Sequence, residues 1–297
     1  MTDKNQIICI GSLLWDVIGR SNSVMRVGSD VPGRIRRIPG GVALNIAMTL
    51  RRFGVHPVAL SAIGRDPAGQ ELMQACKSLG VDTSFVYLSD DLPTDIYMAI
   101  EGANGLIAAI ADAHSLEAAG AKILRPLHDG RLGSADAPYA GIVALDGNLT
   151  EALLADIAGD PAFARADLRV APASPGKAER LRPLIGHPNA TFYVNTEEAG
   201  YLCHATFDDA ASAAEGLRAL GVARALVTNG GQAAAAADQA GVVCATPPQV
   251  LVTRVTGAGD TFMAAHIATE ARGADGQNAL SAALNAAAAY VSGDTSS

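Results

Sequence analysis

The chain has 297 residues, of which 49% are hydrophobic and 18% are charged, so it can bury a large core in one main domain. Its net charge of −8 is spread along the sequence without a long block of like charges, which argues against a nucleic-acid partner. The four cysteines are far apart and the histidines show no zinc-ligand spacing, so a disulfide framework and a zinc site are excluded. The sequence supports neither secretion nor membrane spanning, and we expect a cytoplasmic protein without a membrane partner.

Short apolar runs alternate with segments of helical periodicity. The expected strands are 7–10, 58–63, 142–145, 168–171, 192–194 and 225–228, and the expected helices are 41–53, 69–79, 151–157, 208–220, 257–272 and 276–291. Apolar strands that alternate with helices are typical of a parallel sheet covered on both faces. The sequence therefore predicts a doubly wound α/β fold with a mainly parallel sheet. The alanine-rich tract 233–237 is interpreted as a compositional feature only.

Two segments in the first third interrupt this alternation. Segment 17–38 is rich in Gly, Ser, Asn, Pro and Arg, and segment 94–111 contains two β runs around Asn104-Gly105, a strong hairpin signal. We expect them to form a small β-sheet that closes over a site as a lid and excludes water. A peripheral hairpin and a homodimer contact through the lid are the alternatives. The predicted division is 17–38 and 92–112 for the lid, and 1–16, 39–91 and 113–297 for the large domain.

The sharpest motif is Gly257-Ala258-Gly259-Asp260, preceded by Thr256, at the start of a helical segment. Glycines at a helix start let backbone N–H groups converge on an anion, and the helix dipole adds positive potential. An Asp on the first turn can then accept a proton from an attacking hydroxyl group. The motif thus predicts a phosphate site with Asp260 as the catalytic base, although a capped helix with a glycine-rich lead-in gives the same pattern. Walker A and dinucleotide-binding fingerprints are absent.

A second constellation combines Gly40-Gly41 and Asn45, again at a helix start, with Asp16 after the first strand. The glycine pair permits a ligand to approach the backbone, while Asn45 and Asp16 offer hydrogen-bonding groups to vicinal hydroxyls. In a parallel sheet these features lie at the carboxyl edge, where ligands of open α/β folds bind. A turn at Gly40-Gly41 and caps at Asp16 and Asn45 are the structural alternatives.

Together these motifs resemble the ribokinase (PfkB) family of carbohydrate and nucleoside kinases, in the same order along the chain. The resemblance implies phosphoryl transfer from ATP to a hydroxymethyl group of a small sugar or nucleoside, with Mg²⁺ as the metal. By this resemblance Asp16, Gly40, Gly41 and Asn45 bind the substrate, Glu198 organises Mg²⁺ in the motif Asn195-Thr196-Glu197-Glu198, and Asn195, Thr228, Gly230, Gly231 and Thr256 contact the nucleotide.

Within the family, the sequence is most similar to pseudouridine kinases. The similarity includes Tyr97 and Asp112, which would offer a uracil ring a stacking surface and a carboxylate, unless they merely pack the lid and cap the next segment. Ribose, fructose, ketodeoxygluconate and adenosine are the alternative acceptors. Leu14 and Leu44 depart from the family pattern near the sugar, so a kinase-like ligand-binding protein without turnover is the alternative from another class.

Arg254 also departs from the pattern. It stands where the family usually has an Asp, or an Asn in the pseudouridine-type members, that helps to form a monovalent cation site. An arginine cannot ligate K⁺, and its guanidinium supplies fixed positive charge instead. We therefore expect activity with little dependence on K⁺.

Overall fold

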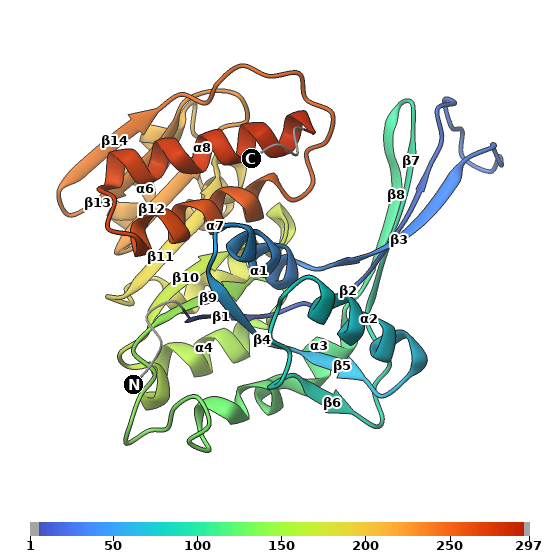
Figure 1. Cartoon of the computed structure of the whole chain (residues 1–297). Helices are drawn as coiled ribbons and strands as arrows, with labels where there is room; N and C mark the ends of the chain where they lie inside the picture. Colours follow the sequence, from blue (N-terminus) through green and yellow to red (C-terminus); the bar gives the residue numbers. More distant parts are fainter. Residues whose placement is uncertain (1–5, 294–297) are drawn as a thin grey trace.

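An eight-stranded sheet forms the centre of the computed structural model, which describes residues 6–293 (Figure 1). Its order is β14-β13-β12-β11-β10-β9-β1-β4. Neighbouring strands from β12 to β4 run parallel, whereas β13 and β14 complete one edge in antiparallel fashion. The bounds are β1 (Gln6–Ile10), β4 (His56–Leu60), β9 (Ile142–Asp146), β10 (Asp167–Ala171), β11 (Ala190–Asn195), β12 (Arg224–Thr228), β13 (Ala234–Asp238) and β14 (Gly241–Ala245). The predicted doubly wound α/β fold is confirmed.

Helices cover both faces of this sheet, because its strands are apolar on both sides. In β1, Ile7 and Cys9 belong to one hydrophobic cluster, and Ile8 and Ile10 belong to the other. The first cluster is completed by α1 (Val42–Arg52), α2 (Pro67–Ser78), α7 (Ala258–Ala271) and α8 (Gly276–Ser292). The second is completed by α3 (His114–Ala119), η1 (Gly120–Leu127), α4 (Glu151–Gly159), η2 (Pro161–Phe163), η3 (Pro175–Leu184), α5 (Thr196–Cys203) and α6 (Ala210–Leu220).

A separate four-stranded sheet, β3-β2-β7-β8, projects from the α/β body (Figure 1). It contains β2 (Leu14–Arg20), β3 (Arg34–Gly40), β7 (Ile96–Gly102) and β8 (Gly105–Asp112). The predicted hairpin at Asn104-Gly105 is confirmed, since β7 and β8 pair antiparallel across it. Met98 and Ile110 face each other in this pairing with exposed side chains. The domain boundaries and a homodimer through this sheet stay predictions.

Two expectations about strands need correction. The expected strand 58–63 is divided into β4 and β5 (Ala62–Gly64), because after Ser61 the chain leaves the main sheet and pairs with β6 (Tyr87–Ser89). The alanine-rich tract is not merely compositional, since it forms β13, whose small buried side chains let α6 approach closely. Among residues 6–293, no helix has the length and apolar character needed to cross a membrane. The expectation about a leader concerns residues 1–5, which lie outside the described part of the chain.

Candidate active site

The starts of α1 and α7 meet at one point of the molecule. Asn45, on the first turn of α1, donates a hydrogen bond from Nδ2 to Oδ2 of Asp260, on the first turn of α7, over 2.9 Å. The two residues are 215 positions apart in the sequence. The structure therefore brings both glycine-led motifs together, as expected from the carboxyl edge of a parallel sheet.

The loop that leads into α7 has a shape that only glycine adopts easily. Gly257 is the residue before the helix and has φ of 86°, in the left-handed region. A Cβ atom at this position would lie 2.6 Å from the hydroxyl of Tyr290, which itself donates to the carbonyl of Thr256 over 2.9 Å. A Cβ at Gly259 would meet nothing within 4 Å. Because the first amides of a helix have no partner within it, this open helix start can receive an anion.

The glycine pair before α1 is required by close contacts. Gly41 has φ of 100°, and a Cβ there would lie 2.4 Å from the carbonyl oxygen of Ser12. A Cβ at Gly40 would lie 2.0 Å from Oδ2 of Asp16, so the carboxylate of Asp16 packs directly against this backbone. The turn at Gly40-Gly41, which the sequence allowed as a structural alternative to a ligand contact, therefore lies in the same site as Asp16 and Asn45.

Carboxylates are concentrated around Asp260. Burial raises the pKa of Asp260 to about 7, and the charges of Asp146, Asp16 and Glu198 act in the same direction, against the hydrogen bond from Asn45. Burial also raises the pKa of Asp16 to about 6 and that of Glu198 to about 7. Perturbed carboxylates that influence one another at an edge of an α/β sheet are typical of a catalytic site.

Asp146 is a site residue that the sequence reading missed. It ends β9, is fully buried, and accepts hydrogen bonds from the backbone N–H groups of Ser12 over 2.8 Å and Asn148 over 2.7 Å. Asn148 in turn accepts a 2.6 Å hydrogen bond from Lys177. The network holds the turn after β1 in place. Because the Ser12 hydroxyl accepts a hydrogen bond from the backbone N–H of Val42 and the Ser12 carbonyl packs against Gly41, the network also positions the start of α1. The Asp146-Gly147-Asn148 segment directly after an apolar run was the available signal.

The residues predicted for the nucleotide and metal lie at the ends of neighbouring strands. Asn195 ends β11 and is paired in register with Thr228, the last residue of β12. Asn195 and Glu198 form a reciprocal capping box, each accepting the other's backbone N–H over 2.8 Å. Gly230 and Gly231 follow Thr228 in the β12–β13 turn and have no atom within 4 Å of an added Cβ. They leave open space beside this edge of the sheet.

The small sheet places its two predicted ligand contacts on opposite faces. Asp16 in β2, Tyr97 in β7 and Ala111 in β8 are aligned in register, and directly paired residues point to the same face. Asp112 is aligned instead with Ile96, one position away, and its carboxylate lies 2.8 Å from Nδ1 of His114. Tyr97 therefore shares a face with Asp16, whereas the register does not bring Asp112 to that face.

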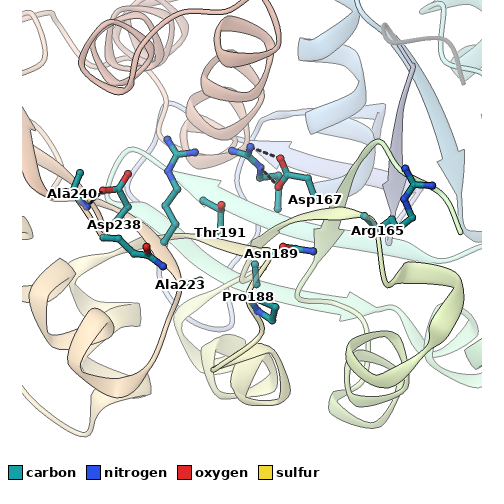
Figure 2. A pocket seen from close by; sticks show the side chains of 13 residues that line it. Arg165, Asp167, Pro188, Asn189, Thr191, Ala223, Asp238 and Ala240 are labelled. Carbon is teal, nitrogen blue, oxygen red and sulfur yellow. Dashed lines mark hydrogen bonds and ion pairs between the residues drawn. The ribbon is translucent and has the colours of Figure 1, made fainter.

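At the opposite end of the strands, the first residues of β10, β11 and β12 line a cavity of about 640 Å³ (Figure 2). Two of its basic residues are ion-paired. Arg169 binds Asp167 through two hydrogen bonds and donates to Glu270 over 2.6 Å. Arg224 also donates to Glu270, near the end of α7. This cluster anchors the far end of the helix that carries Asp260, so its role is structural.

A parallel sheet with a projecting small sheet, and a carboxylate beside an open glycine-built helix start, define a ribokinase-type kinase fold. Residues 4–295 match the model of the pfkB family carbohydrate kinases, and the chain belongs to this family. Members are phosphotransferases that act on sugar hydroxyl groups, and the chain is such an enzyme, acting on a sugar or nucleoside.

Named relatives agree with this assignment. The chain is 29% identical to pseudouridine kinase of Escherichia coli (strain K12) over 89% of its own length and 83% of that kinase. A carbohydrate kinase from Agrobacterium tumefaciens superposes with a TM-score of 0.79 at 27% identity, covering 95% of this chain and 89% of that one. Arabidopsis thaliana ribokinase, complexed with ribose and ATP, has a TM-score of 0.75 at 18% identity and covers 96% and 92% of the two chains.

Proposed function

We propose that this enzyme transfers a phosphoryl group from ATP to the hydroxymethyl group of pseudouridine. The observation that carries the proposal is the contact between Asn45 and Asp260, which joins the acceptor-side helix to the helix start that can bind an anion. The similarity to a named pseudouridine kinase over 89% of the chain supports the choice of acceptor.

In this proposal, Asp260 removes the proton from the acceptor hydroxyl as that oxygen attacks the phosphorus. Asn45 orients the carboxylate by donating to Oδ2, which leaves Oδ1 for the substrate. Asp16 accepts hydrogen bonds from sugar hydroxyls beside Gly40, and Tyr97 on the same face of the small sheet packs against the uracil ring. The amides at the start of α7 bind phosphate oxygens and stabilise their charge.

The chain's residues fit MgATP. Mg²⁺ keeps several waters and is usually held by one or two carboxylates and the phosphates, so a protein cage is not required. The described residues indeed contain no cluster of three metal-ligating side chains, but Glu198 is 8% exposed and uses only Oε2 in its capping hydrogen bond. Glu198 would orient the ion, which neutralises phosphate charge when bound. Thr228, Gly230 and Gly231 border the space for the nucleotide.

The two residues that depart from the family pattern near the sugar, Leu14 and Leu44, belong to the hydrophobic core. Leu44 is completely buried and Leu14 is 5% exposed. Neither side chain offers a polar group to a ligand. A coupled ADP-release assay against pseudouridine, uridine, adenosine, ribose, fructose and ketodeoxygluconate tests the acceptor. We expect the highest kcat/KM for pseudouridine; a higher value for another compound would assign a different acceptor, and no ADP release with any of them would favour a ligand-binding protein.

The pKa of Asp260 predicts how the rate depends on pH. The base must be deprotonated, and burial raises its pKa to about 7, so the active form is lost as the pH falls through 7. We expect kcat/KM to decrease about tenfold per pH unit below this value and to level off above it. Measuring kcat/KM against pH with pseudouridine as the acceptor tests this decrease. A profile that stays flat from pH 5 to pH 8 would contradict a titrating base at this position.

Arg254 predicts independence from K⁺. Its Nε donates to the carbonyl of Tyr290 over 2.8 Å and its guanidinium lies 3.8 Å from the Tyr290 ring centroid. Tyr290 holds the carbonyl of Thr256 just before the anion loop, so protein groups already order this segment. We expect rates in Na⁺, K⁺ and tetramethylammonium buffers to agree within about twofold. A strong increase specific to K⁺ would be the contrary result.

A further inference from the structure

A second cavity lies away from Asp260, between the segment that precedes β7 and the segment that follows β8. It has a volume of about 290 Å³ and is lined by Phe85 and Tyr87 on one side and by Lys122 and Arg125 on the other. Arg65 and Arg131 complete its rim. We call it the basic groove. None of its lining residues is acidic, in a protein whose net charge is −8.

Two of the four cations are available to a ligand. Arg65 pairs with Asp90 over 2.9 Å, and Arg131 pairs with Asp129 over 2.7 Å. Lys122 and Arg125 form no ion pair within residues 6–293; instead they lie 5.5 and 5.9 Å from the centroid of the Tyr87 ring. The hydrogen bond from Ser89 lowers the pKa of Asp91, and the charge of Lys122 acts in the same direction through space, without an ion pair between the two side chains. Two exposed, unpaired cations beside one ring attract an anion.

The size and the floor of the groove define the ligand further. At about 290 Å³ it lies at the lower limit of small-molecule sites. Its floor includes the rings of Phe85 and Tyr87, which pack against the same hydrophobic cluster and are only partly covered by the protein. Inorganic phosphate would leave this floor exposed to water, whereas an anion that carries a ring would cover it.

The groove also lies beside the two connections that flank the β7–β8 hairpin of the small sheet. Thr94 lies between β6, which contains Tyr87, and β7. Its N–H and hydroxyl groups both donate hydrogen bonds to the carboxylate of Asp66, the residue after Arg65. Asp95 accepts hydrogen bonds from the backbone N–H groups of Ser115 and Leu116 over 3.0 Å, at the start of the segment that leads to Lys122 and Arg125. A ligand that bridges Tyr87 and Arg125 therefore links the incoming to the outgoing chain.

We propose that the basic groove binds a ring-bearing phosphate monoester and that this binding stabilises the two connections of the β7–β8 hairpin to the α/β body. The phosphate contacts Lys122 and Arg125, and the ring covers Phe85 and Tyr87. The site is separate from the kinase site, so its occupancy is measured without turnover.

Calorimetric titration of the full chain with phenyl phosphate tests the binding. We expect the variant Lys122→Gln/Arg125→Gln to bind at least tenfold more weakly than the wild type. The control Arg52→Gln/Lys77→Gln removes two exposed cations from α1 and α2 and should stay within twofold. Added NaCl should weaken the wild-type binding. Equal affinity of the groove variant would place phenyl phosphate elsewhere and overturn the proposal, as would inorganic phosphate that binds as tightly as phenyl phosphate.

Hydrogen exchange tests the coupling. With phenyl phosphate, the amides of residues 94–96 and 115–116 are expected to exchange at least threefold more slowly in the wild type and at an unchanged rate in the groove variant. Unchanged exchange in the wild type at saturation would overturn the coupling to the small sheet. Both measurements are independent of the acceptor, so a failure here is distinct from a failure of the pseudouridine proposal.

Discussion

Replacing Asp260 by Asn is expected to lower kcat by about 10²- to 10⁴-fold, the usual contribution of a positioned general base. The amide has nearly the same shape as the carboxylate, and its oxygen can still accept the hydrogen bond that Asn45 donates. What it loses is the capacity to take the proton of the attacking hydroxyl group. Nucleotide affinity should change little, because the backbone amides at the start of α7 remain.

Steady-state kinetics and calorimetric nucleotide binding measure the two parts of this prediction. The matched control is Asp156→Asn on the exposed surface of α4, which removes one carboxylate without touching the site. It should retain full kcat. If Asp260→Asn kept more than about half of the wild-type kcat, the role of general base would have to be given to another group.

Replacing Glu270 by Gln is expected to destabilise the fold by about 3–5 kcal/mol, the typical effect of removing one partner from a buried ion pair. Glu270 accepts hydrogen bonds from Arg169 and Arg224, and the side chain of Arg169 is only 8% exposed. Burial alone would raise the pKa of Glu270, but the hydrogen bond from Arg224 and the charge of Arg169 outweigh it and lower the pKa to about 2. A neutral amide cannot compensate the charge of Arg224, and it leaves the buried Arg169 with Asp167 as its remaining carboxylate partner.

Urea unfolding of the wild type and the variant measures this loss. Because the pKa of Glu270 is lowered from 4.5 to about 2 on folding, its contribution is complete above about pH 4.5 and disappears as the pH falls through 2. The difference between the two proteins should therefore shrink in acid. Glu215→Gln, on the exposed side of α6, is the control and should change stability by less than about 0.5 kcal/mol. A loss below 1 kcal/mol for Glu270→Gln at pH 7 would contradict the anchoring role.

The main elements of the fold could be predicted because their signals are local. β9, for example, begins with the continuous apolar run 142–145, since both faces of this strand are covered by other elements. The helices α1 and α7 are preceded by glycines that their backbone conformations require, at Gly41 and Gly257. β13 escaped recognition because alanine has no strand preference, and its assignment depends on pairing with β12 and β14.

The site was predictable only in part. Asp260 and Asn45 could be proposed from the sequence because glycine-led motifs mark them, and Asp16 because of its place after the first strand. Asp146 was missed because its function depends on Ser12 and Asn148, whose approach no spacing reveals. For Asp112, a shift of one position in the register determines the face of the sheet, and a sequence pattern does not contain the register of two distant strands.

The sequence by itself determined the doubly wound architecture, the hairpin and the two glycine-led helix starts, because periodicity and backbone conformation act over a few residues. Only the tertiary structure decided that Asn45 and Asp260 touch, that Tyr97 shares a face with Asp16 while Asp112 does not, and that Lys122 and Arg125 lie beside the ring of Tyr87. These relations depend on how strands pair and helices pack across long separations, where each contact is set by the whole core rather than by its neighbours in the chain.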